Sequence, residues 1–251
     1  MSNIVFNFAD RIVVVTGGAT GIGLAVTKAF ANARAHVIAL DIDEEGGAAI
    51  GDTTESASFL RCDVTDEADI EAAFAHIEKD RGRIDVLVNN AGGFWLQRTT
   101  EELSTEEWRR VIDLNLTSVF LTSRRAVPLL RQSKSGRIIN IGSLAGQTAG
   151  YRTSPPYAAA KAAVHGLSRV MAHELAGEGI TVNSIAPSAV LTDRIRHVRG
   201  VAEREETAAS IPLGHYQTPD ELAAWVLFLA PQEAGYMTGQ TIAVNGGRFM
   251  A

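Results

Sequence analysis

Tyr157 and Lys161 stand four residues apart, in a stretch whose pattern predicts a helix. A phenol ionises only near pKa ~10, so a tyrosine acts as a base near neutral pH only where its surroundings favour the phenolate. A nearby ammonium group does so, and residues four apart lie on one face of a helix, about one turn from each other. Ser154 and Pro155 suit the cap and first turn of such a helix. The pair predicts a proton-transferring site, although the spacing alone also fits a surface pair, so other groups must accompany it.

Glycines at positions 17, 18, 21 and 23 lie between a β-branched run and an amphipathic stretch. Glycine lets the backbone turn tightly and approach a pyrophosphate, whose charge is favoured by the free N–H groups and the dipole of a helix N-terminus. Such a cluster alone can mark a simple turn. Because this one follows an expected strand and opens an expected helix, it predicts a dinucleotide-binding loop.

Asp41 ends the second expected strand. A carboxylate at that place can accept hydrogen bonds from both ribose hydroxyls of an adenosine, and it repels a 2′-phosphate. Neither Gly18 nor Ile42 carries a positive charge that would attract such a phosphate, so these residues predict NAD rather than NADP. Asp63, after the third expected strand, is a candidate for the adenine edge with Val64 packing on the ring, or else a turn or helix cap.

Short apolar runs alternate with helix-length amphipathic stretches along the chain. The expected strands are residues 11–16, 36–40, 58–62, 86–89, 137–141, 181–185 and 241–244, and the expected helices are 21–33, 66–80, 105–132, 155–178 and 220–230. Runs such as 12–15 are apolar on both faces, as in parallel strands covered by helices on both sides. The alternation predicts an α/β fold, a single Rossmann-type domain over residues 1–251 with a doubly wound, seven-stranded parallel sheet. Residues 189–219 carry no strand pattern and are expected to form a substrate lid.

Composition narrows the class of protein. The net charge of −6 argues against nucleic acid or an anionic membrane as the main partner. No signal-peptide pattern is evident, and no apolar run reaches the ~20 residues that span a bilayer, so a cytoplasmic protein is expected. The single cysteine, Cys62, is expected to be a small buried apolar residue rather than a catalytic thiol. No metal site is expected.

Taken together, the motifs resemble the short-chain dehydrogenase/reductase family over nearly the whole chain. The resemblance rests on Thr16-Gly17-x-x-x-Gly21-x-Gly23, Asn89-Asn90-Ala91-Gly92, Asn115, Ser143, Tyr157 with Lys161, and Pro187-Ser188-Ala189-Val190-Leu191-Thr192, in that order. It implies a catalytic set of Asn115, Ser143, Tyr157 and Lys161. The cofactor contacts that the residues and the resemblance predict are Gly17, Thr20, Gly21, Ile22, Gly23, Asp41, Ile42, Asp63, Val64, Asn90, Ala91, Gly92, Tyr157, Lys161, Pro187, Val190 and Thr192.

The mechanism that the resemblance implies places a substrate hydroxyl between Ser143 and Tyr157. Tyr157 takes the hydroxyl proton while a hydride passes to the nicotinamide, and Ser143 hydrogen-bonds the developing oxyanion. Lys161 is expected to lower the pKa of Tyr157 and to bind the nicotinamide ribose. Asn115 is expected to hold a water that links Lys161 to solvent.

The chain departs from the family pattern at two positions. Ser188 stands where a glycine is usual, which would cost on the order of 1 kcal/mol if the backbone there needs a positive φ. Arg34 stands where a helix-ending glycine is usual, and this difference is expected to affect stability rather than chemistry.

The preference for NAD favours oxidation of a secondary alcohol, such as a polyol, a sugar or a hydroxy acid. Expected substrate contacts are Ser143, Trp95, Arg152 and Tyr157. Basic residues near this edge allow an anionic substrate, or else pair with acidic residues of the lid; they are Arg98, Arg152, Arg194, Arg196, His197 and Arg199. Two alternatives stay open: a 3-oxoacyl-thioester reductase using NADPH, and a catalytically silent dinucleotide-binding scaffold. The resemblance also implies a homotetramer that pairs the helices expected at 105–132 and 155–178.

Overall fold

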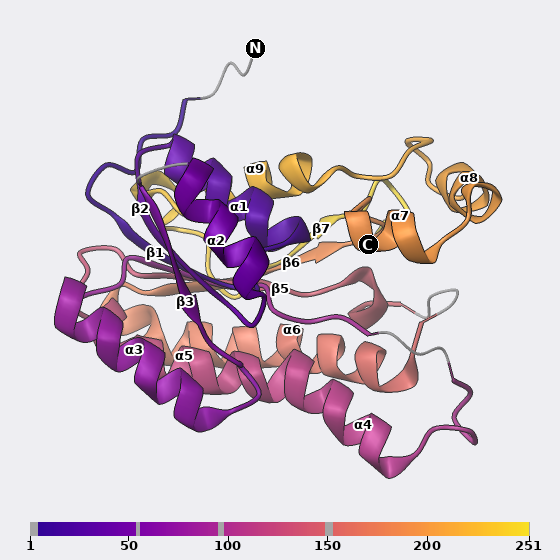
Figure 1. Ribbon diagram of the computed structural model, residues 1–251, viewed down its shortest axis with the longest axis horizontal. Coiled ribbons are helices and arrows are strands. Elements are labelled where there is room, and N and C mark those ends of the chain that lie inside the picture. The colour runs from indigo at the N-terminus through magenta and orange to yellow at the C-terminus, as the bar shows by residue number, and fades with distance from the viewer. Residues whose placement is uncertain (1–4, 54–55, 95–97, 149–152, 251) are drawn as a thin grey trace.

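The computed structural model describes residues 5–53, 56–94, 98–148 and 153–250. Within them lies one seven-stranded, fully parallel sheet in the order β3-β2-β1-β4-β5-β6-β7 (Figure 1). The strands are β1 (Ile12–Thr16), β2 (His36–Asp41), β3 (Ala57–Arg61), β4 (Val86–Asn89), β5 (Arg137–Ile141), β6 (Thr181–Pro187) and β7 (Thr241–Val244). The order reverses between β1 and β4, where open sheets of this kind bind ligands. The predicted Rossmann-type fold class is confirmed.

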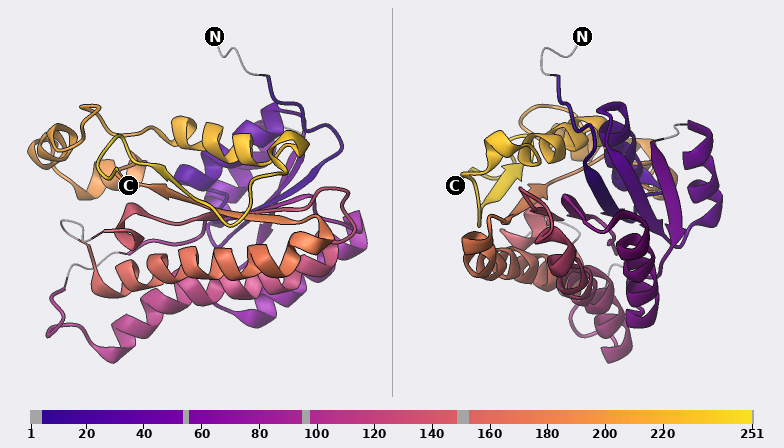
Figure 2. Two further views of the ribbon diagram at one scale, coloured as in Figure 1. Left: turned by 180° about the vertical axis from the view of Figure 1, so that it is seen from behind. Right: turned by 90° about the vertical axis from the view of Figure 1, so that its left-hand side faces the viewer.

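Helices cover both faces of the sheet, with α1 and α9 on one side and α3, α5 and α6 on the other (Figures 1 and 2). The helices are α1 (Gly21–Asn32), α2 (Glu44–Thr53), α3 (Glu67–Arg81), α4 (Thr105–Ile112), α5 (Ser118–Leu130), α6 (Pro155–Leu175), α7 (Asp193–Val198), α8 (Val201–Ala209) and α9 (Pro219–Leu229). Among these described helices, none is long and apolar enough to cross a lipid bilayer.

The sequence pattern did not predict three of these helices, and it merged others. The helix expected at 105–132 is two helices, α4 and α5, joined by a π-helical turn at Asp113–Thr117. Helix α2 contains Gly46 and Gly47, which lower helix propensity and obscured its pattern. Helices α7 and α8 occupy the segment 189–219, beyond the end of β6, and lie together at one end of the molecule (Figure 1). A role of this segment as a lid stays a prediction.

Alternate residues of the strands supply two separate cores. Val13 and Val15 of β1 pack with Phe30 of α1 and Val226 of α9 in one core. Val14, between them in sequence, packs in the other core, where α3, α5 and α6 supply most of the helical side chains. Because successive side chains of a strand point to opposite faces, a continuous apolar run is what a doubly covered strand needs. Cys62 is 1% exposed in the second core, and burial raises the pKa of its thiol to about 12, as expected for a residue that only packs.

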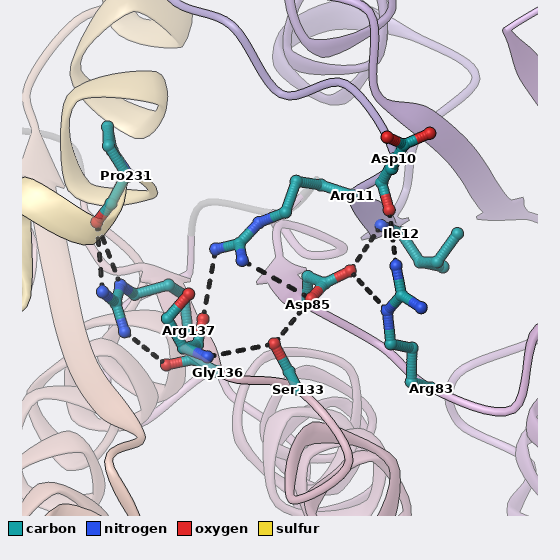
Figure 3. Close-up of polar contacts among 10 residues, drawn as sticks. Asp10, Arg11, Ile12, Arg83, Asp85, Ser133, Gly136, Arg137 and Pro231 are labelled. Carbon is teal, nitrogen blue, oxygen red and sulfur yellow. Dashed lines mark hydrogen bonds and ion pairs between the residues drawn. The ribbon is translucent and has the colours of Figure 1, made fainter.

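A buried carboxylate ties together the amino ends of β1 and β4 (Figure 3). Asp85 directly precedes β4, and its Oδ2 accepts hydrogen bonds from the Ile12 amide at 2.8 Å and from Arg83 Nε at 3.2 Å. Its Oδ1 accepts one from the Ser133 hydroxyl at 2.5 Å. These bonds satisfy a charge that would be costly to bury alone.

Arg137 fixes the amino end of β5 beside this cluster (Figure 3). The side chain is 2% exposed, and its guanidinium donates to the carbonyl of Pro231 at 3.1 and 3.3 Å and to that of Gly136 at 2.9 Å. Burial, and then the charge of Arg11, lower the pKa of this guanidinium. These contacts at the amino edge of the sheet hold the strand ends together. The candidate active site lies at the opposite, carboxyl edge.

Arg34 follows α1 in a left-handed conformation, with φ of 73°. A side chain costs roughly 1–2 kcal/mol in that region, which is why helices so often end at a glycine. The departure from the family pattern at this position therefore carries a backbone strain.

Replacing Arg34 by glycine should stabilise the fold by about 1 kcal/mol, because glycine adopts this conformation without steric cost. We expect the Tm to rise by about 2–4 °C in thermal unfolding. Gly82→Ala is the mirror control, since Gly82 ends α3 with φ of 70° and an added β-carbon would meet nothing within 4 Å. A lowered Tm for Gly82→Ala together with an unchanged Tm for Arg34→Gly would contradict the strain at Arg34.

Candidate active site

Helix α6 brings Tyr157 and Lys161 to the carboxyl end of β5. The Lys161 side chain is 3% exposed, its Nζ donates to the carbonyl of Ile141 at 2.8 Å, and it lies 5.7 Å from the centre of the Tyr157 ring. The pair therefore faces the sheet, which excludes the alternative of a solvated surface pair. Ser154 occupies the N-cap of α6 and Pro155 the first turn as expected, but the Ser154 hydroxyl caps no N–H of this described helix.

Ser143 lies between β5 and α6 and faces Tyr157. It begins a short 3-10 turn, and its Oγ accepts a hydrogen bond from the Ala145 amide at 3.1 Å. Its hydroxyl also hydrogen-bonds to the phenol of Tyr157. Two hydroxyl groups of the expected catalytic set are thus in contact, and they can converge on one substrate oxygen.

The pKa of Tyr157 differs from the expectation that it is lowered. Burial raises the pKa of Tyr157, and the effects that oppose it are the hydrogen bond with Ser143 and then the charge of Arg194. The Lys161 ammonium donates to the carbonyl of Ile141 and lies 5.7 Å from the centre of the Tyr157 ring. A lowering of the Tyr157 pKa by Lys161 stays a prediction. Burial lowers the pKa of Lys161 to about 8, so this amine can exchange a proton close to neutral pH.

Asn115 lies in the π-helical turn and is fully buried. Its Oδ1 accepts from the Gly93 amide at 2.8 Å, and its Nδ2 donates to the carbonyls of Gly93 and Val111, each at 2.9 Å. Such π-turns often mark functional sites. This side chain fixes the loop after β4, in which the Phe94 ring lies 4.7 Å from the Tyr157 ring. A water held by Asn115 stays a prediction.

The predicted dinucleotide loop forms a tight turn between β1 and α1. A β-carbon at Gly23 would lie 1.8 Å from the carbonyl oxygen of Gly17, so only glycine permits this approach. Thr20 is the N-cap of α1, and its hydroxyl caps none of the helix N–H groups that the structure describes. A helix N-terminus without a side-chain cap is suited to an anion such as a pyrophosphate, so the residues present fit the dinucleotide.

Asn90 ties this loop to the end of β4. Its Nδ2 donates to the carbonyls of Thr16 and Gly17, each at 3.0 Å. The Thr16 hydroxyl in turn accepts from the amides of Asn90 at 3.0 Å and Ala91 at 3.1 Å. The predicted motif after the fourth strand, which continues to Gly92, therefore supports the cofactor loop.

Asp41 lies beside the loop at the end of β2. Its Oδ2 accepts from the Ala19 amide at 2.9 Å and its Oδ1 from the Ile42 amide at 2.8 Å. Each carboxylate oxygen has more than one lone pair, so ribose hydroxyls can still be accepted. The Ile42 side chain is 61% exposed at the same place. The Oδ1 of Asp63 accepts from the amide and hydroxyl of Thr65, which matches the alternative of a turn residue, and Val64 is buried.

The predicted nicotinamide segment reaches the start of α1. Pro187 ends β6, Val190 is buried, and the Cγ2 of Thr192 lies 3.4 Å from where a β-carbon of Gly21 would be. Among the described non-glycine residues, positive φ occurs at Asp10 and Arg34 and not at Ser188. The hydroxyl of Ser188 donates to the carbonyl of Asn245 at 3.0 Å, so the turn is held by a side chain instead of requiring glycine.

The basic residues near this edge do not act together. Arg98, Arg196 and Arg199 each lie within 4 Å of an acidic side chain, which are Glu107, Asp193 and Glu203 respectively. His197 bonds through Nδ1 to the carbonyl of Asp193. Of these pairs, the one between Arg199 and Glu203 matches the alternative in which the basic residues pair with acidic residues of the segment 189–219.

Arg194 differs from them, because its Nη2 donates to the carbonyl of Phe94 at 2.5 Å and its charge acts on Tyr157. Trp95 and Arg152, the other expected substrate contacts, lie outside the described residues. Within the described part of the chain, no three histidine, cysteine, aspartate or glutamate side chains are grouped so as to hold a metal ion.

Sequence reasoning missed one buried residue of this site, His165. Its ring lies one turn beyond Lys161 on α6 and bonds to the carbonyl of Ser143. The same four-residue spacing that indicated the tyrosine–lysine pair could have indicated it.

The sheet reverses its order beside a glycine loop, and a half-buried tyrosine lies at the same edge with a buried lysine and a buried serine. This arrangement is typical of a dinucleotide-binding α/β protein with a proton-transfer site. A family model described as Enoyl-(Acyl carrier protein) reductase matches residues 17–248. The 3-oxoacyl-[acyl-carrier-protein] reductase FabG of Escherichia coli (strain K12) is 40% identical, over 97% of this chain and 99% of that protein. The L-fucose dehydrogenase of Oryctolagus cuniculus is 37% identical, over 96% of this chain and 85% of that protein.

A solved structure, the Pseudomonas aeruginosa RhlG/NADP active-site complex, superposes with a TM-score of 0.91 at 36% identity and covers 98% of this chain and 99% of that chain. The chain belongs to the short-chain dehydrogenase/reductase family, and it is an oxidoreductase of the kind that uses a nicotinamide cofactor.

Replacing Arg194 by glutamine should raise the pKa of Tyr157, because it removes a positive charge that favours the phenolate. A base with a higher pKa is less ionised at a given pH, so the rise of the alcohol-oxidation rate with pH should move to higher pH. Arg196→Gln is the matched control on the same helix, since Arg196 is half exposed and paired with Asp193. Identical pH profiles for the two variants would contradict an effect of Arg194 on Tyr157.

Proposed function

We propose that the protein interconverts a ketone and a secondary alcohol, with a 3-oxoacyl thioester as the first candidate for the ketone. The contact between the hydroxyls of Ser143 and Tyr157 carries the reaction type, because two adjacent donors aimed at one point suit a single carbonyl oxygen. The reaction named in the family model's description, reduction of an enoyl group, acts on a carbon–carbon double bond, so its product takes up the proton on carbon and not on oxygen. Similarity to FabG over nearly the full length of both chains supports the 3-oxoacyl substrate.

Ser143, Tyr157 and Lys161 would have separate roles in this reaction. A bound nicotinamide ring supplies the hydride for reduction or accepts it in oxidation. Ser143 and Tyr157 hold the carbonyl oxygen, and Tyr157 gives it a proton as the alcohol forms. In oxidation Tyr157 takes that proton back. Lys161, with its pKa lowered to about 8 and its Nζ 5.7 Å from the centre of the Tyr157 ring, would supply the proton that restores the phenol.

The predicted cofactor contacts would hold the two halves of the dinucleotide. The α1 N-terminus, with Thr20, Gly21, Ile22 and Gly23, would bind the pyrophosphate. Asp41 and Ile42 would contact the adenosine, with Asp63 and Val64 at the adenine. Thr192 and Val190 would contact the nicotinamide.

Asp41 supports NAD(H), whereas the similar RhlG structure contains NADP. We favour NAD(H) because a carboxylate bonded to the glycine loop at 2.9 Å would face any 2′-phosphate with like charge. The described neighbours Gly18 and Ile42 bring no positive charge to offset it.

Oxidation of a sugar or polyol with NAD is the second candidate. Asp41 is the observation that favours it, and similarity to an L-fucose dehydrogenase supports it. The catalytically silent scaffold is less compatible with a buried Lys161 and a Ser143–Tyr157 contact, which a scaffold does not need.

The homotetramer stays a prediction. Phe120 on α5 is 46% exposed and Val170 on α6 is 64% exposed, on the two helices that the assembly would pair. Burial of these side chains between subunits would support that arrangement.

A substrate panel tests the function. A 3-oxoacyl thioester is offered with NADH and with NADPH, and sugars, polyols and hydroxy acids are offered with NAD and with NADP, while the reduced cofactor is followed by absorbance. We expect turnover of the thioester, and a Tyr157→Phe variant should lose at least about 100-fold in kcat while binding the cofactor normally. Turnover of sugars alone would favour the second candidate. Binding of cofactor without turnover of any member of the panel would favour the scaffold.

Replacing Asp41 by alanine tests the cofactor. The ratio of kcat/KM for NAD to that for NADP should fall about tenfold or more, because the like charge facing a 2′-phosphate is removed. The ratio is the readout, since loss of the bond to Ala19 can weaken both cofactors. Asp63→Ala is the matched control, and an equal change of the ratio in both variants would count against Asp41 as the selector.

A further inference from the structure

His165 is a buried titratable residue that the proposed reaction does not use. It lies on α6 one turn beyond Lys161 and is 4% exposed. Its Nε2 lies 3.1 Å from the carbonyl oxygen of Ser143, and its Nδ1 lies 2.9 Å from the hydroxyl of Ser184 on β6. The imidazole therefore bridges a strand of the sheet and the residue that faces Tyr157.

The partners of the ring assign its tautomer. A carbonyl oxygen can only accept, so Nε2 carries the proton and donates to Ser143. The Nδ1 then accepts from the Ser184 hydroxyl. Burial is the main cause that lowers the pKa of His165, so the ring is neutral near pH 7. One neutral tautomer satisfies both contacts.

The backbone at Ser143 needs such a partner because it lies beyond the sheet ladder. Strand β5 ends at Ile141, whose carbonyl receives the Lys161 ammonium. Gly142 donates to the Ile185 carbonyl at 2.8 Å and packs directly on the imidazole, since a β-carbon at Gly142 would lie 2.2 Å from the ring Cε1. Two residues one turn apart on α6 thus hold alternate carbonyls of the segment that leads to the Ser143 hydroxyl.

We propose that His165 is a positioning residue for the reaction: its Nε2–H fixes the peptide of Ser143 so that the serine hydroxyl faces Tyr157. The inference rests on the role proposed for Ser143. Ser184 contributes by holding Nδ1, which orients the ring so that Nε2–H points to the carbonyl of Ser143. A hydroxyl that must lie within hydrogen-bond reach of both Tyr157 and a substrate oxygen depends on the orientation of its backbone.

A pair of substitutions separates positioning from packing. In His165→Gln the side-chain amide nitrogen falls near the place of Nε2 and can still donate to Ser143. In His165→Asn the amide falls near the place of Nδ1 and reaches Ser184 but not Ser143. The proposal predicts that the Gln variant keeps kcat within about threefold of the unchanged protein. The kcat of the Asn variant should fall about tenfold, as expected for the loss of one hydrogen bond. The KM for the cofactor should change in neither.

Equal losses of kcat in the two variants would overturn the proposal, as would a loss that follows their melting temperatures. If the Asn variant does not fold, Ser184→Ala gives the same test, because it leaves the imidazole present and removes the hydroxyl that orients the ring through Nδ1. We expect it to lower kcat about threefold, and an unchanged kcat would overturn the proposal. Ser133→Ala is the control, since it removes another hydroxyl that is bonded inside the fold, to Asp85 at the amino edge of the sheet, opposite the edge that carries Ser143.

Ser143→Ala separates this inference from the proposed function. Full activity of that variant would refute the role of Ser143, and with it both proposals. An inactive Ser143→Ala together with equal His165 variants would refute the positioning role alone.

Discussion

Thr16 and Asn90 join the carboxyl ends of β1 and β4, at the point where the order of the sheet reverses. Four hydrogen bonds between the two residues and their neighbours hold the glycine loop against the loop after β4. A parallel sheet brings strand ends to one edge, but it does not by itself fix the loops that follow them. Here the glycine loop after β1 and the segment leading to Phe94 are placed relative to each other by this contact.

Buried side-chain hydrogen bonds also hold α6, on the other side of the site, against the sheet. Asn89 donates to Asn140 across β4 and β5 at 2.8 Å, and Asn140 donates to Ser168 on α6 at 2.9 Å. Buried polar groups of this kind are costly unless each is satisfied, and they then favour a single arrangement of the elements they connect. Helix α6 is thereby held against β5, so that Tyr157 and Lys161 are placed by the interior of the protein and not by a flexible loop.

The sequence was sufficient to predict those parts of the structure that depend on local patterns. Runs apolar on both faces located the strands, and the glycines of the loop after β1 were informative because close backbone approach leaves no other choice of residue, as Gly23 illustrates. The break between α4 and α5 was not predictable in this way. It is stabilised when Asn115 bonds to Gly93, a residue far away in sequence.

The electrostatic features of the site could likewise not be predicted from the spacing of residues in the sequence. The four-residue interval placed Lys161 beside Tyr157, but the direction of its ammonium depends on the carbonyl of Ile141, and the pKa of Tyr157 depends on how deeply the ring is buried. The unusual Ser188 was explained only by its bond to Asn245, a contact with the last part of the chain.

The bond between Arg137 and Pro231 bears on the order in which the protein folds. It joins residues 94 positions apart, and the neighbouring bond from Ile12 to Asp85 joins residues 73 apart. Contacts of such long separation carry a large loop-closure entropy and form slowly. The guanidinium of Arg137 therefore keeps its water until the segment after α9 packs against it, so this charge is buried only once two parts of the chain 94 residues apart have met.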